Sequence, residues 1–216
     1  PNGFTRAMQA MGVTVLHHRL SFEDAVAATP GRSDLWKQVA KGAMLRLDLP
    51  LLVPGDETVL YTDTDIIFQG DPGGYAFPCS DIAVGPEFQM DNYTDVNTGV
   101  MVINLGGARA QFQGLREWTQ EHLETVPDYD QGAVRLYCQG RLHPLMNWKP
   151  YWGVGANAIV VHYHGPKPDE FSNPGFAPLF DHPVYNSLYS ASPDGYRHYL
   201  AAWHALHSEL LAAFPD

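Results

Sequence analysis

The sequence is poor in positive charge, in cysteine and in long apolar runs. Its 216 residues include 13 Lys and Arg against 24 Asp and Glu, which gives a formal net charge of -11. Binding to nucleic acid or to an anionic membrane surface relies on many cationic contacts, so this charge balance disfavours both partners. Any anionic ligand must therefore be met by a few placed cations or by a metal ion.

The two cysteines, Cys79 and Cys138, lie far apart and form no CxxC pair. Their spacing indicates neither a zinc site nor a disulfide framework, and it fits a reducing compartment. The sequence also has no apolar run of about 18 residues, and its first residues lack the apolar core of a signal peptide. We therefore predict a cytoplasmic protein with no membrane span in this chain. Because the sequence opens on Pro1, it is also compatible with an excised part of a longer polypeptide.

Length and composition favour one domain. At 24.0 kDa with 45% hydrophobic residues, the chain is long enough for one full core and too short for two. Residues 1–216 are therefore predicted to form a single domain.

Apolar segments of strand type alternate with segments of helical spacing. Strands are predicted at residues 12–18, 58–61, 66–68, 81–85, 98–105, 142–148 and 158–165. Helices are predicted at 33–49 with Ser33 as N-cap, at 114–124, 130–139 and 196–214, and as a brief turn capped by Ser21. The Pro- and Gly-rich span from 165 to 194 is predicted as an ordered loop or a flap. This alternation predicts a mixed α/β domain whose sheet is mostly parallel and flanked by helices.

The segment YTDTDIIF places two carboxylates directly after an apolar strand. Asp63 and Asp65 stand at i and i+2, so an extended backbone directs both to the same side, where they can share one ion. For a lone DxD motif, a role in a turn or a cap is the commoner interpretation. The position beyond the end of a strand in an open α/β sheet is where such folds bind ligands, and it favours a metal site.

A second polar cluster closes the strand in AIVVHYHGPKP. Either His162 or His164 could supply an imidazole, and Lys167 could supply a cation beside it. A histidine on an apolar strand is more often a satisfied structural residue than a ligand. A site of two carboxylates and one imidazole would favour Mn²⁺ somewhat over Mg²⁺, which prefers oxygen ligands alone.

Four motifs in this order resemble glycosyltransferase family 8, the glycogenin and lipopolysaccharide galactosyltransferase type, on the GT-A fold. They are MLRLDLPLL followed by VLYTDTDIIF, then VNTGVMVINL, DQGAV and VHYHGPKP. The resemblance spans residues 46–168. The ordered combination is far more specific than any one of these motifs.

The resemblance implies metal-dependent transfer of a sugar from a UDP-sugar donor to an acceptor hydroxyl, with retention of anomeric configuration. The acceptor would be a glycan, a lipid or a protein. The residues implied to bind Mn²⁺ or Mg²⁺ are Asp63, Asp65 and His162. Those implied to bind the donor are Arg46, Tyr61, Thr64, Asn97, Thr98, Gly165 and Lys167, and those implied to face the transferred sugar as catalytic residues are Asp130 and Gln131.

Two features depart from the family pattern. Asp169 follows Pro168 where the family usually has tryptophan. The family also begins with a strand and loop that contact the uridine base, and no convincing counterpart precedes Gly12. Either the sequence begins after that strand, or Pro1 to Arg6 and other loops replace it.

Two other functions compete with sugar transfer. One is a nucleotide-sugar-binding accessory domain without turnover. The other is a metal-dependent nucleotidyltransferase, which ranks last because the sequence has no Gly-rich basic loop near its start to hold a triphosphate. A purely structural protein is disfavoured, since four polar motifs would then gather at strand ends without a packing reason. Three aromatic residues, Trp148, Tyr151 and Trp152, could stack on a sugar, although a place in the core or rim is commoner.

Overall fold

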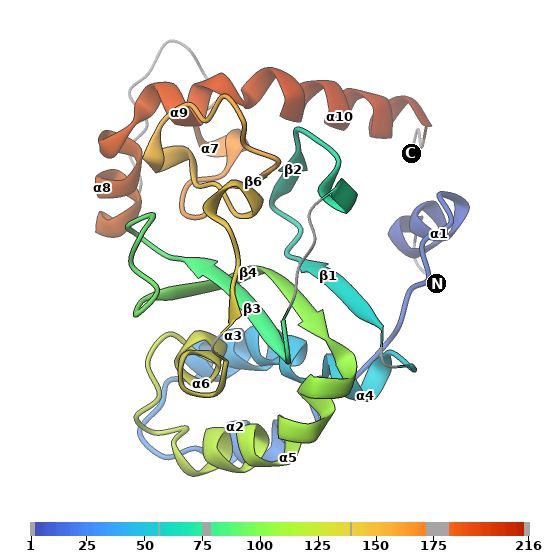
Figure 1. Cartoon of the computed structure of the whole chain (residues 1–216), viewed down its shortest axis with the longest axis vertical. Helices are drawn as coiled ribbons and strands as arrows, with labels where there is room; N and C mark the ends of the chain where they lie inside the picture. Colours follow the sequence, from blue (N-terminus) through green and yellow to red (C-terminus); the bar gives the residue numbers. More distant parts are fainter. Residues whose placement is uncertain (1–2, 56, 75–78, 139, 172–181, 214–216) are drawn as a thin grey trace.

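The computed structural model describes residues 3–55, 57–74, 79–138, 140–171 and 182–213, and it has a mixed α/β fold (Figure 1). The α-helices are α1 (Gly3–Ala10), α2 (Glu23–Ala28), α3 (Asp34–Met44), α4 (Leu49–Leu52), α5 (Leu105–Glu121), α6 (Asp130–Tyr137), α7 (Pro168–Phe171), α8 (Pro183–Ala191), α9 (Pro193–His198) and α10 (Leu200–Ala213). The strands are β1 (Thr58–Thr62), β2 (Ile66–Phe68), β3 (Ile82–Pro86), β4 (Val96–Asn104), β5 (Gly140–Arg141) and β6 (Val160–His162).

The strands form a four-stranded sheet of order β1-β4-β3-β5 and a two-stranded sheet of β2 and β6. Strand β4 runs antiparallel to β1 and β3, β2 runs antiparallel to β6, and β5 runs parallel to β3. The mixed α/β class is confirmed, but parallel pairing is the minority within the described residues. Among the described residues, strands β1 to β4 follow one another without an intervening α-helix, whereas a parallel pair needs a long crossover connection.

Strand β4 is buried on both faces, as its continuous apolar run predicted. Met101 and Ile103 pack into a core with helices α2, α3, α5 and α6, whereas Val100 and Val102 face a second core that includes Val160 of β6. Figure 1 shows those helices on one side of the sheet and β2, β6 and helices α7 to α10 on the other. The ends of β1 and β4 therefore lie between two packed layers.

Two predicted strands are wrong. The segment 12–18 has no hydrogen-bonded strand partner, and Val13 and Leu16 are exposed, because no strand among the described residues lies beside it. The segment 142–148 instead contains a 3₁₀ turn at Pro144–Met146, since proline fixes φ and offers no N–H to a ladder. Trp148 alone forms an isolated parallel bridge, to Val161.

Helix boundaries also shift. Ser33 caps α3 as predicted by accepting from the Trp36 N–H, but the chain continues helically past Pro50 through a 3₁₀ turn and α4. Helix α5 begins at Leu105, earlier than predicted, because the Asn104 side chain caps it at the Gly107 N–H. The predicted C-terminal helix is divided into α9 and α10, and its last residue, Phe214, lies outside the described residues.

Part of the 165–194 span is helical, in α7, α8 and the start of α9, and residues 172–181 lie outside the described part. Cys79 and Cys138 are both free thiols. Within the described residues, no helix combines the length and apolar character needed to cross a bilayer.

Ser21 does not cap α2, because its groups bind Asp48. The Ser21 N–H and Oγ donate to the two Asp48 carboxylate oxygens at 2.6 and 2.8 Å, and His18 Nε2 lies 2.8 Å from the same carboxylate. Asp48 is fully buried, so these contacts replace its hydration. We expect Asp48→Asn to lower the free energy of unfolding by about 1–3 kcal/mol, because an amide nitrogen cannot accept a hydrogen bond. Urea unfolding measures this loss, and the exposed neighbour Asp24→Asn should leave the midpoint nearly unchanged.

Candidate active site

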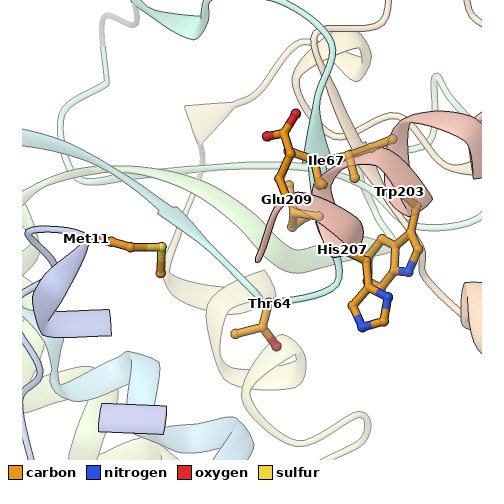
Figure 2. Close-up of a pocket in the computed structure, with 8 residues that line it drawn as sticks. Met11, Thr64, Ile67, Trp203, His207 and Glu209 are labelled. Atoms are coloured by element: carbon orange, nitrogen blue, oxygen red, sulfur yellow. The ribbon is translucent and has the colours of Figure 1, made fainter. Parts of the chain in front are cut away.

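The turn between β1 and β2 carries the two aspartates of the DxD motif. The Asp63 N–H donates to the Gly99 carbonyl at 2.7 Å, and the Tyr163 N–H donates to the Asp65 carbonyl at 2.9 Å. Backbone bonds to β4 and to the end of β6 thus fix both residues. Thr64, which lies between them, is exposed and lines a separate cavity (Figure 2).

His162 ends β6 directly opposite Ile66 in the β2–β6 register, which brings its ring to the aspartates. Asp63, Asp65 and His162 offer ligand atoms that all lie within 4.8 Å of one another. His162 Nε2 lies 3.4 Å from Asp65 Oδ1, a buried oxygen without a hydrogen-bond partner. A buried carboxylate oxygen without a donor is costly, so this donor set fits a divalent cation.

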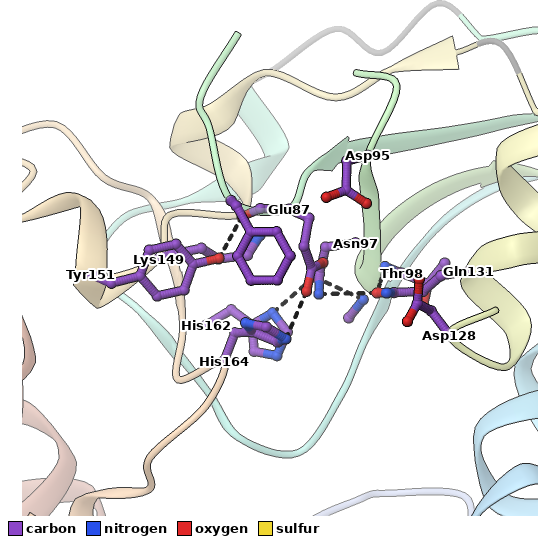
Figure 3. Close-up of polar contacts among 12 residues, drawn as sticks. Glu87, Asp95, Asn97, Thr98, Asp128, Gln131, Lys149, Tyr151, His162 and His164 are labelled. Carbon is purple, nitrogen blue, oxygen red and sulfur yellow. Dashed lines mark hydrogen bonds and ion pairs between the residues drawn. The ribbon is translucent and has the colours of Figure 1, made fainter. Parts of the chain in front are cut away.

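Two amide side chains determine the tautomer of His162 through their contacts with Nδ1. Its Nδ1 lies 3.0 Å from Asn97 Oδ1 and 3.2 Å from Asn147 Oδ1, as Figure 3 shows for Asn97. Both amide oxygens are acceptors, so we assign the proton to Nδ1, which leaves the Nε2 lone pair facing Asp65. Burial lowers the pKa of His162 to about 4, against the opposing influence of Asp65. The ring is therefore neutral at pH 7, as a metal ligand must be.

Arg46 and Tyr61 hold Asp63. The Arg46 guanidinium contacts Asp63 Oδ1 at 3.1 Å, donates to the Thr98 carbonyl at 2.9 Å and lies 3.4 Å from Asp130 Oδ2. The Tyr61 hydroxyl donates to Asp63 Oδ1 at 2.6 Å. Arg46 therefore links Asp63 to β4 and to the start of α6.

Lys167 holds the second aspartate. Its Nζ donates to Asp65 Oδ2 at 2.5 Å and to the Tyr163 carbonyl at 2.7 Å. Burial alone would raise the pKa of Asp65, but His162 and the Lys167 ammonium hold that pKa below its ordinary value. The carboxylate is therefore ionised throughout the physiological range.

A cavity of about 540 Å³ lies beside the cluster. The predicted site residues that line it are Arg46, Asp63, Asp65, Asn97, Thr98, Asp130, Gln131 and His162. Gln131 Oε1 accepts from Asn97 Nδ2 and from the Thr98 N–H, both at 3.2 Å, so α6 and β4 are joined at this wall (Figure 3). Among the described lining residues five are Asp or Glu and one is Arg, so an anionic ligand here would be repelled unless a cation offset that charge.

Burial raises the pKa of Asp130 to about 6, although Arg46 acts in the opposite direction. The native state then binds this proton more tightly than the unfolded chain does, so Asp130 reduces stability as pH rises from about 4 to 6. We expect Asp130→Asn to be more stable than the parent by about 2–3 kcal/mol at pH 7.5 and about equal to it at pH 4. Urea unfolding at both pH values measures the difference. A gain that is the same at both values would contradict this assignment.

Sequence reasoning missed a polar network that includes two residues of the cavity wall, Glu87 and His164. His164 Nε2 lies 2.8 Å from Oε1 of Glu87, a buried residue whose carbonyl accepts from Tyr151. Lys149 is fully buried, donates to the carbonyls of Asn147 and Pro86, and has its pKa lowered by burial to about 7. In the sequence, this network is indicated only by the position of its polar residues at the ends of apolar segments.

His164 lines the same cavity but pairs with Glu87 and does not join the aspartates. Gly165 packs against Leu188, which lines the cavity. It has φ +92°, and a Cβ there would lie 2.8 Å from Leu188 Cδ1, so the close packing requires a glycine. The aromatics at 148, 151 and 152 pack edge to face, with ring centroids 5.6 and 5.8 Å apart, and Tyr151 is buried.

Comparison with known proteins identifies the fold. No protein-family model matches the sequence, and no curated protein matches it. The galactosyltransferase LgtC, solved with donor and acceptor sugar analogues, aligns with TM-score 0.53 and 17% identity over 79% of this chain and 73% of that chain. An active-site mutant of LgtC aligns with TM-score 0.52 and 18% identity over 78% and 72%. The apo form of the glycosyltransferase GlyE from Streptococcus pneumoniae aligns with TM-score 0.51 and 18% identity over 76% and 46%.

The chain therefore has the GT-A fold of these glycosyltransferases and spans about half the length of GlyE. Strand β1 stands at the edge of the sheet and, among the described residues, pairs with β4 alone. No described strand precedes β1, so the counterpart of the base-contacting strand that the sequence lacked is not found in this part of the chain.

Proposed function

We propose that this chain is a glycosyltransferase that moves a sugar from a UDP-sugar donor to an acceptor hydroxyl in a metal-dependent reaction. The observation that carries the proposal is the meeting of Asp63, Asp65 and His162 at the wall of a polar cavity. The GT-A fold, shared with enzymes that transfer sugars, supports the same conclusion. Fold alone does not determine function, so the proposal depends on this site.

The donor set suits Mn²⁺ or Mg²⁺, with the imidazole favouring Mn²⁺. Asp63, Asp65 and His162 would hold the ion through carboxylate oxygens and Nε2. When bound, the ion supplies Lewis-acid stabilisation of the negative charge that grows on the departing diphosphate. Asn97 and Asn147 keep the imidazole in the tautomer that this role requires.

Arg46 and Lys167 provide fixed positive charge on either side of the aspartates. Arg46 is largely buried and is held by oxygens of Asp63, Thr98 and Asp130, so it orients Asp63 with little conformational freedom. The Lys167 side chain is more exposed than that of Arg46, and its ammonium would exchange Asp65 for a phosphate oxygen when the donor binds. Both residues would then contact the diphosphate, as the family resemblance implies.

Asn97, Thr98, Asp130 and Gln131 form the wall on which the transferred sugar would lie. Asp130 and Gln131 would stabilise an oxocarbenium-like sugar from one face while the acceptor arrives on the face of the departing phosphate. That geometry gives retention of configuration. Burial raises the pKa of Asp130 to about 6 against the opposing influence of Arg46, so the carboxyl group is still mostly ionised at pH 7.5 and would offer negative charge to that sugar.

The acceptor would be a glycan, a lipid or a protein hydroxyl. Phe88 and Tyr185 also line the cavity, and the acceptor would approach the donor along them. Binding without turnover is the alternative that the sequence leaves open. The two differ in their products, because only a transferase releases UDP.

Isothermal titration of UDP into the metal-stripped protein, with and without Mn²⁺, tests the donor site. A panel of UDP-sugars with and without simple acceptors, assayed for UDP release, then tests turnover, and NMR of the product gives the anomeric configuration. Metal-dependent binding with release from one donor supports the proposal. Binding without release favours the accessory-domain alternative, and no binding under any metal condition overturns the donor site.

A further inference from the structure

The turn that leads into α6 has positive φ at two consecutive residues that are not glycine. Asp128 has φ +51°, and Tyr129 has φ +54° with ψ -118°. Every other position with positive φ among the described residues is a glycine. Positive φ places the Cβ of an L-residue too close to a backbone carbonyl oxygen, and a bulky tyrosine rarely adopts it. Such strain persists only where the surrounding structure holds it, and it gathers at active sites and switch segments.

The strained turn lies directly before the two residues that are proposed to face the transferred sugar. The Gln131 N–H donates to the Asp128 carbonyl at 3.1 Å, and the two residues lie side by side in Figure 3. Asp130 follows Tyr129 in the chain, and its buried carboxylate lies 3.4 Å from Arg46. The turn and the first two residues of α6 all line the cavity of about 540 Å³. The backbone of the turn therefore determines where Asp130 and Gln131 point.

An aromatic stack ties the turn to helix α3. The rings of Tyr129 and Trp36 have centroids 5.7 Å apart and an interplanar angle of 26°. The Arg32 guanidinium lies 4.4 Å from the centre of the Trp36 ring and donates to the carbonyls of Leu123 and Val126 at 3.2 and 3.1 Å. Both rings also pack against the main core. A stacked aromatic pair is attractive beyond the area that it buries, so it can hold a strained backbone in place.

Contacts with α6 hold the first part of the turn. Arg135 of α6 lies 3.7 Å from Asp128 Oδ2. A Cβ on Gly132 would lie 2.4 Å from the Pro127 carbonyl oxygen, so the turn and the helix pack without space for a side chain. The aromatic stack holds the rest of the turn.

We propose that Tyr129 is a positioning residue for sugar transfer, an inference that rests on the proposed function. Its stack on Trp36 holds the turn in the strained conformation, and that conformation directs Asp130 and Gln131 at the transferred sugar. Without the aromatic ring, any residue other than glycine favours negative φ, so the productive conformation is populated less. The proposed metal ligands lie on the β1–β2 turn and on β6, so they do not depend on Tyr129.

The test compares kcat for UDP release from the active donor with UDP affinity in Mn²⁺, measured by isothermal titration. Tyr129→Ala should lower kcat by about 5- to 30-fold, the population loss that corresponds to one unsupported left-handed residue. UDP affinity should change by less than about twofold, because the metal site is distant in the fold from the stack. Tyr129→Phe keeps the stack and should retain kcat within about twofold.

Tyr129→Gly separates positioning from direct contact with the sugar. Glycine adopts positive φ without a ring to hold it, so this variant should recover most of the kcat that Tyr129→Ala loses. A tyrosine that acted by touching the sugar would gain nothing from glycine. Thermal unfolding establishes that each variant is folded, and Tyr129→Leu replaces Tyr129→Ala if the latter does not fold.

Trp36→Leu removes the other half of the stack and should also lower kcat, although Trp36 does not line the cavity. The double variant with Tyr129→Ala should be no slower than either single variant, because both remove one interaction. Tyr137→Ala is the matched control. Tyr137 is another half-buried tyrosine of α6 beside a tryptophan, Trp118, and it does not line the cavity, so its loss should leave kcat unchanged.

Three results overturn the inference and leave the proposed function intact. They are wild-type kcat in Tyr129→Ala, wild-type kcat in Trp36→Leu, and a kcat in Tyr129→Gly as low as that in Tyr129→Ala. A wild type that releases no UDP from any donor overturns sugar transfer and this inference together.

Discussion

Asp65→Asn is expected to abolish metal-dependent UDP binding and to lower any transfer rate by about 10²- to 10³-fold, the usual cost of losing one charge-stabilising group. Asp65 Oδ1 is the buried oxygen without a donor that faces His162 Nε2. Asparagine keeps the shape of the side chain and removes the negative charge. The bound ion would then be held by one carboxylate and one imidazole, which is too few for tight binding beside a diphosphate.

The measurement is isothermal titration of UDP with Mn²⁺ and without it, followed by the rate of UDP release from the active donor. Asp34→Asn is the matched control, because Asp34 is an exposed aspartate in the first turn of α3, away from the cavity. Thermal unfolding of both variants establishes that each is folded. Metal-dependent UDP binding of wild-type strength in Asp65→Asn would assign the aspartate pair to turn structure, which was the commoner interpretation of a lone DxD motif.

Much of the candidate metal site could be predicted from the sequence, because its parts are local. The i, i+2 spacing of Asp63 and Asp65 after an apolar strand indicates a shared ion. The family resemblance adds a histidine on another strand as the third ligand. Spacing alone left His162 and His164 equal. The pairing of β2 with β6 decides between them in the structure, since it sets His162 opposite Ile66 and turns His164 toward Glu87.

The supporting residues could not be predicted in this way. Asn147 and Glu87 belong to no motif, and they reach the site only because β3, the turn after β5 and β6 converge in space. The segment 12–18 shows the opposite error. Its β-branched residues favour a strand, but a strand also needs a neighbour, and local composition carries no information about that.

Glycines are required at two places where segments approach closely. Gly107 follows another glycine after β4, and α5 runs through both. A Cβ at Gly107 would lie 1.6 Å from the Ser80 carbonyl oxygen, so the helix can approach β3 only where a glycine stands. Gly99 in VNTGVMVINL is also required by a close neighbour, which is the candidate metal ligand His162.

Gly99→Ala is expected to disrupt the proposed metal site although it replaces none of the proposed ligands. A Cβ at Gly99 would lie 2.1 Å from Cε1 of His162, and the ring is held at Nδ1 by Asn97 and Asn147. We expect the imidazole to move, so that Nε2 loses its direction toward Asp65. We expect Mn²⁺ affinity to fall by about 10- to 100-fold, as when an outer-shell partner of a ligand is lost. Overpacking should also lower the free energy of unfolding by about 1–3 kcal/mol.

Gly42→Ala is the control, because a Cβ there meets nothing within 4 Å and the residue lies inside helix α3. It should leave Mn²⁺ binding unchanged and raise stability by about 0.4–1 kcal/mol. A double-mutant cycle then identifies the cause. In a His162→Ala background the space beside Gly99 is open, so Gly99→Ala should cost much less stability there than in the wild type. An equal cost in both backgrounds would show that the strain falls on the backbone of β4 and that the imidazole is free to adjust. In that case Gly99→Ala would bind Mn²⁺ nearly as tightly as the wild type does.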